Sequence, residues 1–147
     1  MKKIGIILLV LVLLALAGGT IFSIVKITSN ETSKTVSALS FQIGNLNESG
    51  RFNKNDTSTM VTKDMLKLED IEIILPEDSG VVYKVFYFDE DGEFISSSEY
   101  LDTHEFKDEP AEGATQVKIV VKPVSDPEIS FFEISKYAKQ ITIKVSK

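Results

Sequence analysis

Apolar residues are distributed in two different ways along the chain. From Ile4 to Val25 there is no charged residue, and most side chains are apolar. As an α-helix, this stretch of 22 residues is about 33 Å long, enough to cross a hydrocarbon core of about 30 Å. After Lys26, apolar residues occur in short runs with polar residues between them, which is the pattern of β-strands. The pattern therefore predicts a transmembrane signal-anchor helix over residues 1–26, followed by a β-rich part.

The same segment also has features of a cleaved signal peptide. Two lysines precede it, and Ala15-Leu16-Ala17 resembles an A-x-A cleavage site. Against cleavage, apolar residues continue beyond Gly19, and a mature chain starting at Gly18 would expose them to water. We therefore expect an uncleaved single span, with a secreted form after cleavage near Ala17 as the alternative. The positive charges before the span place the amino terminus in the cytoplasm and the rest of the chain outside the membrane.

Downstream of the span, the sequence predicts a linker and one all-β domain. Residues 27–40 are rich in Ser and Thr and have little apolar periodicity, which is typical of a linker. Within residues 41–147, the runs with strand character are 71–75, 81–88, 93–97, 116–122 and 140–145. Residues 126–139 fit neither the helix nor the strand period, and we expect a strand there that ends in a short helical turn. About six to eight short strands without a long helix predict an antiparallel β-sandwich.

The clearest local signal is a β-hairpin. Val81 to Phe88 is apolar on both faces apart from Lys84, so we expect this strand to be buried on both sides. Asp89-Glu90-Asp91-Gly92 follows, and Gly92 supplies the positive φ that such a turn needs. Residues 93–97 then return antiparallel to the first strand.

The order of motifs beyond Phe41 resembles a family of small jelly-roll domains, similar to carbohydrate-binding modules, in surface and phage tail proteins of Gram-positive bacteria. The runs that carry the resemblance are 59–66, 83–98, 109–111, 114–122 and 141–143. That family commonly has Arg where this chain has Met60, and Trp where it has Tyr100. The resemblance implies a jelly-roll fold and a non-catalytic, ligand-binding role.

Composition narrows the range of functions. The chain has no cysteine, which excludes disulfides, thiol catalysis, Cys-ligated zinc and a lipoprotein anchor. After residue 26, 13 basic and 22 acidic residues give a net charge of −9, which argues against nucleic acid as a partner. Ten carboxylates between residues 89 and 112 are interpreted as a solvated acidic face, and His104 belongs to no nucleophile motif. We therefore expect neither enzymatic activity nor a cofactor.

Two kinds of binding residue are candidates. Sugar binding needs exposed aromatic rings, and Tyr100 and Phe106 lie in the polar stretch after the predicted hairpin. Asp89 and Asp91 are weaker candidates for Ca²⁺, because the stretch lacks the later bidentate Glu of a helix-loop-helix calcium loop.

The sequence therefore predicts a membrane-anchored, extracytoplasmic and non-catalytic binding module for a glycan, a cell-wall polymer or an envelope protein. The alternative is a structural or accessory subunit of a cell-envelope complex. Small residues in the span, such as Gly18 and Gly19, would let another helix approach closely.

Overall fold

The structure, a computed structural model, describes residues 34–35, 40–106 and 109–145. These residues belong to one compact unit, Ser33–Lys147. The predicted membrane span from Ile4 to Val25 lies outside the described residues. Within the described ranges, no helix is long and apolar enough to cross a membrane.

The described residues are mostly β-structure, and every strand pairing is antiparallel. A large six-stranded sheet has the order β2 (Phe41–Ile43), β5 (Met60–Thr62), β10 (Gln116–Pro123), β8 (Val81–Phe88) and β9 (Phe94–Ser97), and β6 (Leu66–Lys67) also pairs with β10. A small sheet has the order β1 (Lys34–Thr35), β11 (Thr142–Val145) and β7 (Ile71–Ile74). A separate hairpin joins β3 (Asn45–Leu46) to β4 (Phe52–Asn53).

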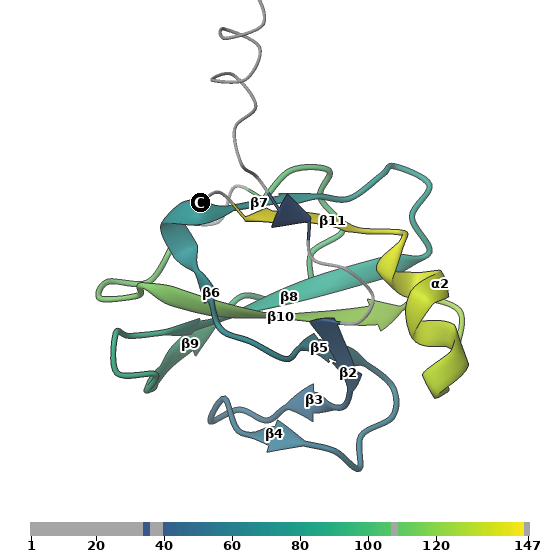
Figure 1. The fold of residues 1–147 in the computed structure, drawn as a ribbon, viewed down its shortest axis with the longest axis horizontal. Coiled ribbons are helices and arrows are strands. Elements are labelled where there is room, and N and C mark those ends of the chain that lie inside the picture. The colour runs from purple at the N-terminus through teal and green to yellow at the C-terminus, as the bar shows by residue number, and fades with distance from the viewer. Residues whose placement is uncertain (1–33, 36–39, 107–108, 146–147) are drawn as a thin grey trace, which may run out of the picture. The chain divides into compact units, whose positions relative to one another are not determined.

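The main hydrophobic core lies between the two sheets, as a β-sandwich requires. Alternate residues of the large sheet, including Tyr83, Val85 and Ile119, are fully buried. They pack in one core with Ile73 and Ile143 of the small sheet. Figure 1 shows the two sheets as separate layers. The period-two pattern of β8 and β10 places one set of side chains in this core. The predicted antiparallel sandwich is thus confirmed at the level of two facing antiparallel sheets.

A second, smaller core lies on the opposite, outer face of the large sheet. It consists of Leu46, Val61, Phe86, Phe88 and Val120, all buried. Figure 1 shows the β3–β4 hairpin beneath this sheet, and Leu46 is the hairpin's residue in the cluster. The prediction that residues 81–88 are buried on both faces is confirmed at Phe86 and Phe88, because the hairpin and the ring of Phe94 cover the outer face there.

The predicted β8–β9 hairpin is also present. Phe86 pairs with Ser97, and Gly92 adopts a φ of 82° in the turn. The Asp89 carboxylate closes the turn, because its Oδ1 accepts the backbone N–H groups of Asp91 and Glu93 at 3.0 and 2.8 Å. Local turn chemistry was sufficient to predict this element.

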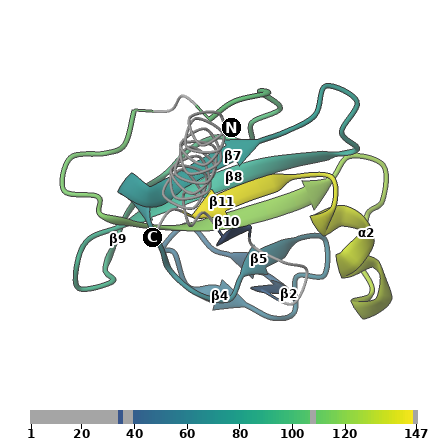
Figure 2. The same ribbon diagram turned by 45° about the horizontal axis from the view of Figure 1, so that its top comes forward.

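Two expectations differ from the structure. The strand expected within residues 126–139 is absent, whereas the short helical turn expected after it is present as η3 (Phe131–Glu133) and α2 (Ile134–Ala138), at the end of the sandwich where β11 begins (Figure 2). The reason is a capping box, in which the hydroxyl and the backbone N–H of Ser130 both donate hydrogen bonds to the carboxylate of Glu133. This arrangement favours a helical turn. In addition, β1 lies within the segment interpreted as a linker, and it pairs with β11.

Candidate functional site

Tyr100 is held over the outer face of the large sheet. The next residue, Leu101, forms a β-bridge with Tyr83, with N–H to O distances of 3.0 and 2.7 Å, and packs against the main core. Because successive side chains of an extended chain point to opposite faces, Tyr100 faces the outer side. Its side chain is 38% exposed. The ring is therefore partly covered by the sheet and partly open to solvent.

Two lysines from neighbouring strands approach this ring. Lys84 of β8 and Lys122 of β10 place their Nζ atoms 5.8 and 5.5 Å from the centre of the Tyr100 ring. Lys84 also lies 5.3 Å from the centre of the Phe86 ring. These distances are in the range of cation–π contacts. The strands therefore bring together an aromatic ring and two ammonium groups that are far apart in the sequence.

Asp56 and Asn45 border the ring on the side of the β3–β4 hairpin. Asp56 Oδ1 accepts hydrogen bonds from the Ser58 hydroxyl and backbone N–H, and its Oδ2 accepts one from Asn45 Nδ2 at 2.8 Å. The Ser58 hydroxyl, followed by Asn45, lowers the pKa of Asp56 below its usual value of 3.8. Burial, followed by the negative charge of Asp56, raises the pKa of Tyr100. The carboxylate is thus ionised at neutral pH, and the phenol is protonated.

We refer to Asn45, Asp56, Lys84, Tyr100 and Lys122 as the Tyr100 cluster. Only Tyr100 was a candidate from the sequence. A signal for one other member was present, because Lys84 is the single charged residue in the apolar run of β8. The other three members are brought to Tyr100 by long-range pairing in the fold, which local sequence patterns do not predict; they are Asn45, Asp56 and Lys122.

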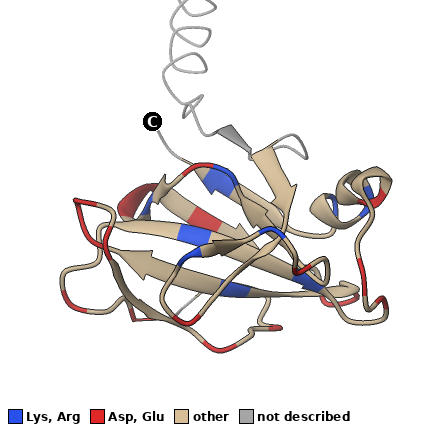
Figure 3. Cartoon of the chain, turned by 90° about the horizontal axis from the view of Figure 1, so that it is seen from below, with Lys and Arg blue, Asp and Glu red and all other residues tan. Residues whose placement is uncertain are grey.

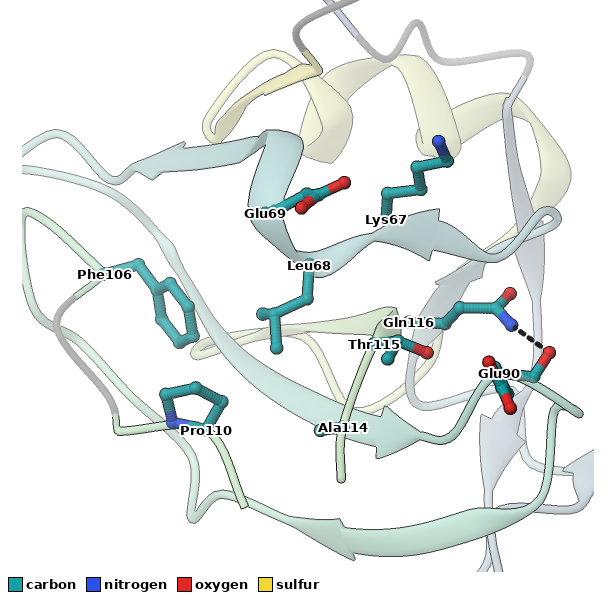
Figure 4. A pocket seen from close by; sticks show the side chains of 9 residues that line it. All are labelled: Lys67, Leu68, Glu69, Glu90, Phe106, Pro110, Ala114, Thr115 and Gln116. Atoms are coloured by element: carbon teal, nitrogen blue, oxygen red, sulfur yellow. Dashed lines mark hydrogen bonds between the residues drawn. The ribbon is translucent and has the colours of Figure 1, made fainter. Parts of the chain in front are cut away.

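Phe106, the second aromatic candidate, lies elsewhere. Its backbone N–H donates to the carbonyl of Ile73 in the small sheet, and its side chain packs against the main core. It lines a groove of about 810 Å³ together with Leu68, Pro110 and Gln116. Figure 4 shows the apolar side chains of this groove on one side and polar groups of Glu90 and Gln116 on the other. The structure therefore does not bring Tyr100 and Phe106 into one site.

Of the two calcium candidates, Asp89 has another role in the structure, whereas Asp91 takes part in the same turn through its backbone N–H. Asp89 Oδ1 is engaged by two backbone N–H groups of its own turn. The backbone carbonyls of Asp89 and Glu90 accept hydrogen bonds from Gln116 Nε2 at 3.0 and 3.1 Å. Among the described residues, no group of three Asp, Glu or His side chains is arranged to hold a metal ion. The arrangement around Asp89 is that of a hairpin cap.

His104 likewise has a local structural partner. Its Nδ1 lies 2.8 Å from the carbonyl oxygen of Leu75, whose own N–H donates to the carbonyl of His104 at 2.9 Å. These two contacts join the loop to the residue that follows β7. The side chain is therefore used to hold the loop against the small sheet.

The fold and the Tyr100 cluster thus define an acidic β-sandwich domain with an aromatic and basic surface on one sheet. In comparisons with known proteins, no family model matches the chain, and neither a curated protein nor a solved structure is detectably similar to it.

Proposed function

We propose that the chain is a membrane-anchored, extracytoplasmic and non-catalytic binding module, and that the Tyr100 cluster binds a glycan or cell-wall polymer. The observation that carries the proposal is the half-open ring of Tyr100 on the outer face of the large sheet, 38% exposed and bordered by polar side chains. A sugar ring presents an apolar face and a rim of hydroxyls. A half-exposed aromatic ring with hydrogen-bonding neighbours is suited to both.

Two features of the sequence support the extracytoplasmic placement and the type of module. The uncharged stretch from Ile4 to Val25 is long enough for one membrane span. The runs over residues 59–66 and 83–98 carry the resemblance to jelly-roll binding domains, and both belong to the large sheet or its hairpin. The two facing antiparallel sheets are compatible with that fold.

The test is binding of the full-length chain, in neutral detergent micelles, to an array of neutral and acidic glycans. We expect binding that Tyr100→Ala abolishes. The matched control is Phe132→Ala, which removes an aromatic ring that is 92% exposed, lies in η3 and does not belong to the Tyr100 cluster. Glycan binding that survives Tyr100→Ala, or the absence of binding to every glycan, would refute the proposal.

A second function, as a structural subunit of an envelope complex, is supported by one specific observation. Phe131 and Phe132 of η3 are 75% and 92% exposed, and their rings contact each other edge to face at 6.0 Å. Val124 nearby in the sequence is 67% exposed. Exposed apolar residues of this size are typical of protein contacts.

This alternative predicts that a photo-crosslinking residue at Phe132 forms one discrete protein adduct in intact cells. The same residue at Lys139, an exposed position just after α2, is the control. Equal labelling at the two positions would argue against a subunit interface at η3.

A further inference from the structure

The charge of the Tyr100 cluster is opposite to that of the domain as a whole. Beyond residue 26 the chain has a net charge of −9. Neither β8 nor β10 contains Asp or Glu, and their charged residues are Lys84, Lys118 and Lys122. Figure 3 shows basic positions on the strands of the domain and most acidic positions on the loops. The centre of the large sheet is therefore a basic strip within an acidic surface.

The three lysines of this strip differ in their partners. Lys118 Nζ donates to the carbonyl oxygen of Lys63 at 2.9 Å, and burial lowers its pKa. In the described part of the chain, the ion pairs within 4.0 Å involve Lys136 and Lys144, and neither Lys84 nor Lys122. The contacts of Lys84 and Lys122 in that part are with aromatic rings. Their ammonium groups thus retain donors for another group.

The acidic member of the cluster, Asp56, already accepts hydrogen bonds from other residues of the domain. Asp56 accepts hydrogen bonds from Ser58 and Asn45 on both of its carboxylate oxygens. The positive charge of Lys122 contributes, as the smallest of several causes, to the lowered pKa of Asp56, but the two side chains are not among the ion pairs within 4.0 Å in the described part of the chain. Two ammonium groups beside one engaged carboxylate leave the cluster with a net positive charge.

From this arrangement we infer that the ligand of the Tyr100 cluster is an acidic glycan, whose sugar ring packs on Tyr100 and whose anionic group is bound by Lys84 and Lys122. The anionic group is a uronate carboxylate or a phosphate diester, since an ammonium group donates hydrogen bonds to both. This inference rests on the proposed function, because it specifies the ligand class of the same site.

The acidic loops limit the distance over which the lysines act. At physiological ionic strength the screening length is about 8 Å, so the two lysines dominate the potential close to Tyr100 and the loops dominate it farther away. An anionic group is therefore attracted by Lys84 and Lys122 once it lies close to the Tyr100 ring.

The experiment compares three polymers on the full-length chain in neutral detergent micelles. They are polygalacturonate, its fully methyl-esterified form, and glucosylated poly(glycerol phosphate). The first two share the same sugar ring and differ at the carboxyl group, which is charged in one and a neutral methyl ester in the other, whereas the third carries phosphate in its glycerol backbone and glucose as its sugar. We expect binding to at least one of the two anionic polymers, none to the methyl ester, and weaker binding as salt is raised from 50 to 500 mM.

The variants separate the role of charge from that of packing. Lys84→Gln combined with Lys122→Gln keeps most of each aliphatic stem and should weaken anionic binding at least about tenfold. The same two positions changed to Arg should retain binding, because the charge remains. The matched control is Lys67→Gln combined with Lys139→Gln, which removes two exposed charges, one at the Phe106 groove and one just after α2, and should leave binding unchanged. Unchanged near-ultraviolet circular dichroism shows that each variant is folded.

Each outcome has one meaning. Equal, Tyr100-dependent binding of polygalacturonate and its methyl ester would overturn the acidic-glycan inference and leave the proposed function intact. Equal weakening by the control pair would also overturn the inference, because the effect would then depend only on net charge. Failure of all three polymers and of every glycan on the array would overturn both.

Discussion

Replacing Leu46 by Ala tests whether the β3–β4 hairpin is packed on the outer face of the large sheet. Leu46 is 5% exposed and belongs to the second core with Phe86, Phe88 and Val120. The substitution removes three carbons, each of which contributes about 0.8 kcal/mol when buried. The transfer contribution is therefore about 2.4 kcal/mol, to which a residual cavity adds. Since the hairpin can move to fill part of the space, we expect a loss of about 2 to 3 kcal/mol.

The assay is thermal unfolding of the full-length chain in neutral detergent, followed by near-ultraviolet circular dichroism. For a domain of this size, the loss corresponds to a decrease in Tm of about 10 °C. Val124→Ala is the control, because its side chain is 67% exposed and should change stability by less than about 0.5 kcal/mol. If Leu46→Ala were as mild as this control, the second core would not exist as described.

Three further changes test local parts of the account. Gly50→Ala should destabilise the domain by about 1 to 3 kcal/mol in urea denaturation, because a Cβ there would meet Phe94 at 2.7 to 2.9 Å and φ is 70°. Gly92→Ala, with a φ of 82° and no atom within 4 Å of the new Cβ, isolates the backbone cost, and an equal effect of the two would contradict the packing at residue 50. Asp56→Asn should lower the free energy of unfolding by about 1 kcal/mol at pH 7. This difference from wild type should shrink as the pH falls below the usual pKa of 3.8, because the lowered pKa of Asp56 means that the side chain stabilises the fold only while its carboxylate is ionised. A difference in unfolding free energy that grew as the pH fell would contradict a lowered pKa of Asp56. Asp89→Ala should lose about 1 to 2 kcal/mol, since two turn N–H groups lose their acceptor, and unchanged thermal unfolding would exclude the capping role.

Local signals predicted the parts of the fold that depend on neighbouring residues. The apolar run of Val81 to Phe88 and the turn ending at Gly92 specify a hairpin by themselves, and the structure has it. In the segment from 126 to 139 the helical turn is present as expected, but the strand expected before it is absent. Periodicity could not distinguish the two structures there, whereas the Ser130-x-x-Glu133 pattern, a capping box, favours a helical turn that begins at Ser130.

The candidate site was less predictable than the fold. Tyr100 stood out as an aromatic residue in a polar stretch. Its neighbours depend on long-range pairing: the register of β8 with β10 sets Lys84 opposite Val120 and Lys122 opposite Val82, and the hairpin brings in Asn45. Period-two alternation in the predicted strand over residues 116–122 places Lys122 on the face opposite to that of Val121, but it does not indicate that Tyr100 lies next to Lys122. Sequence patterns thus predict the face of the sheet on which a side chain lies. Which side chains contact one another depends on how the strands pair in the folded domain.

We propose that the ligand site of the domain is the outer face of the large sheet, at Tyr100. The most direct test is a nuclear magnetic resonance titration of the isotope-labelled, full-length chain in micelles, first with oligogalacturonate and separately with a glucosylated glycerol phosphate oligomer. With at least one of the two ligands, we expect concentration-dependent shifts at Asn45, Lys84, Tyr100 and Lys122, with the groove around Phe106 unchanged. Shifts confined to that groove, or no shifts at the Tyr100 cluster with either ligand, would contradict this assignment.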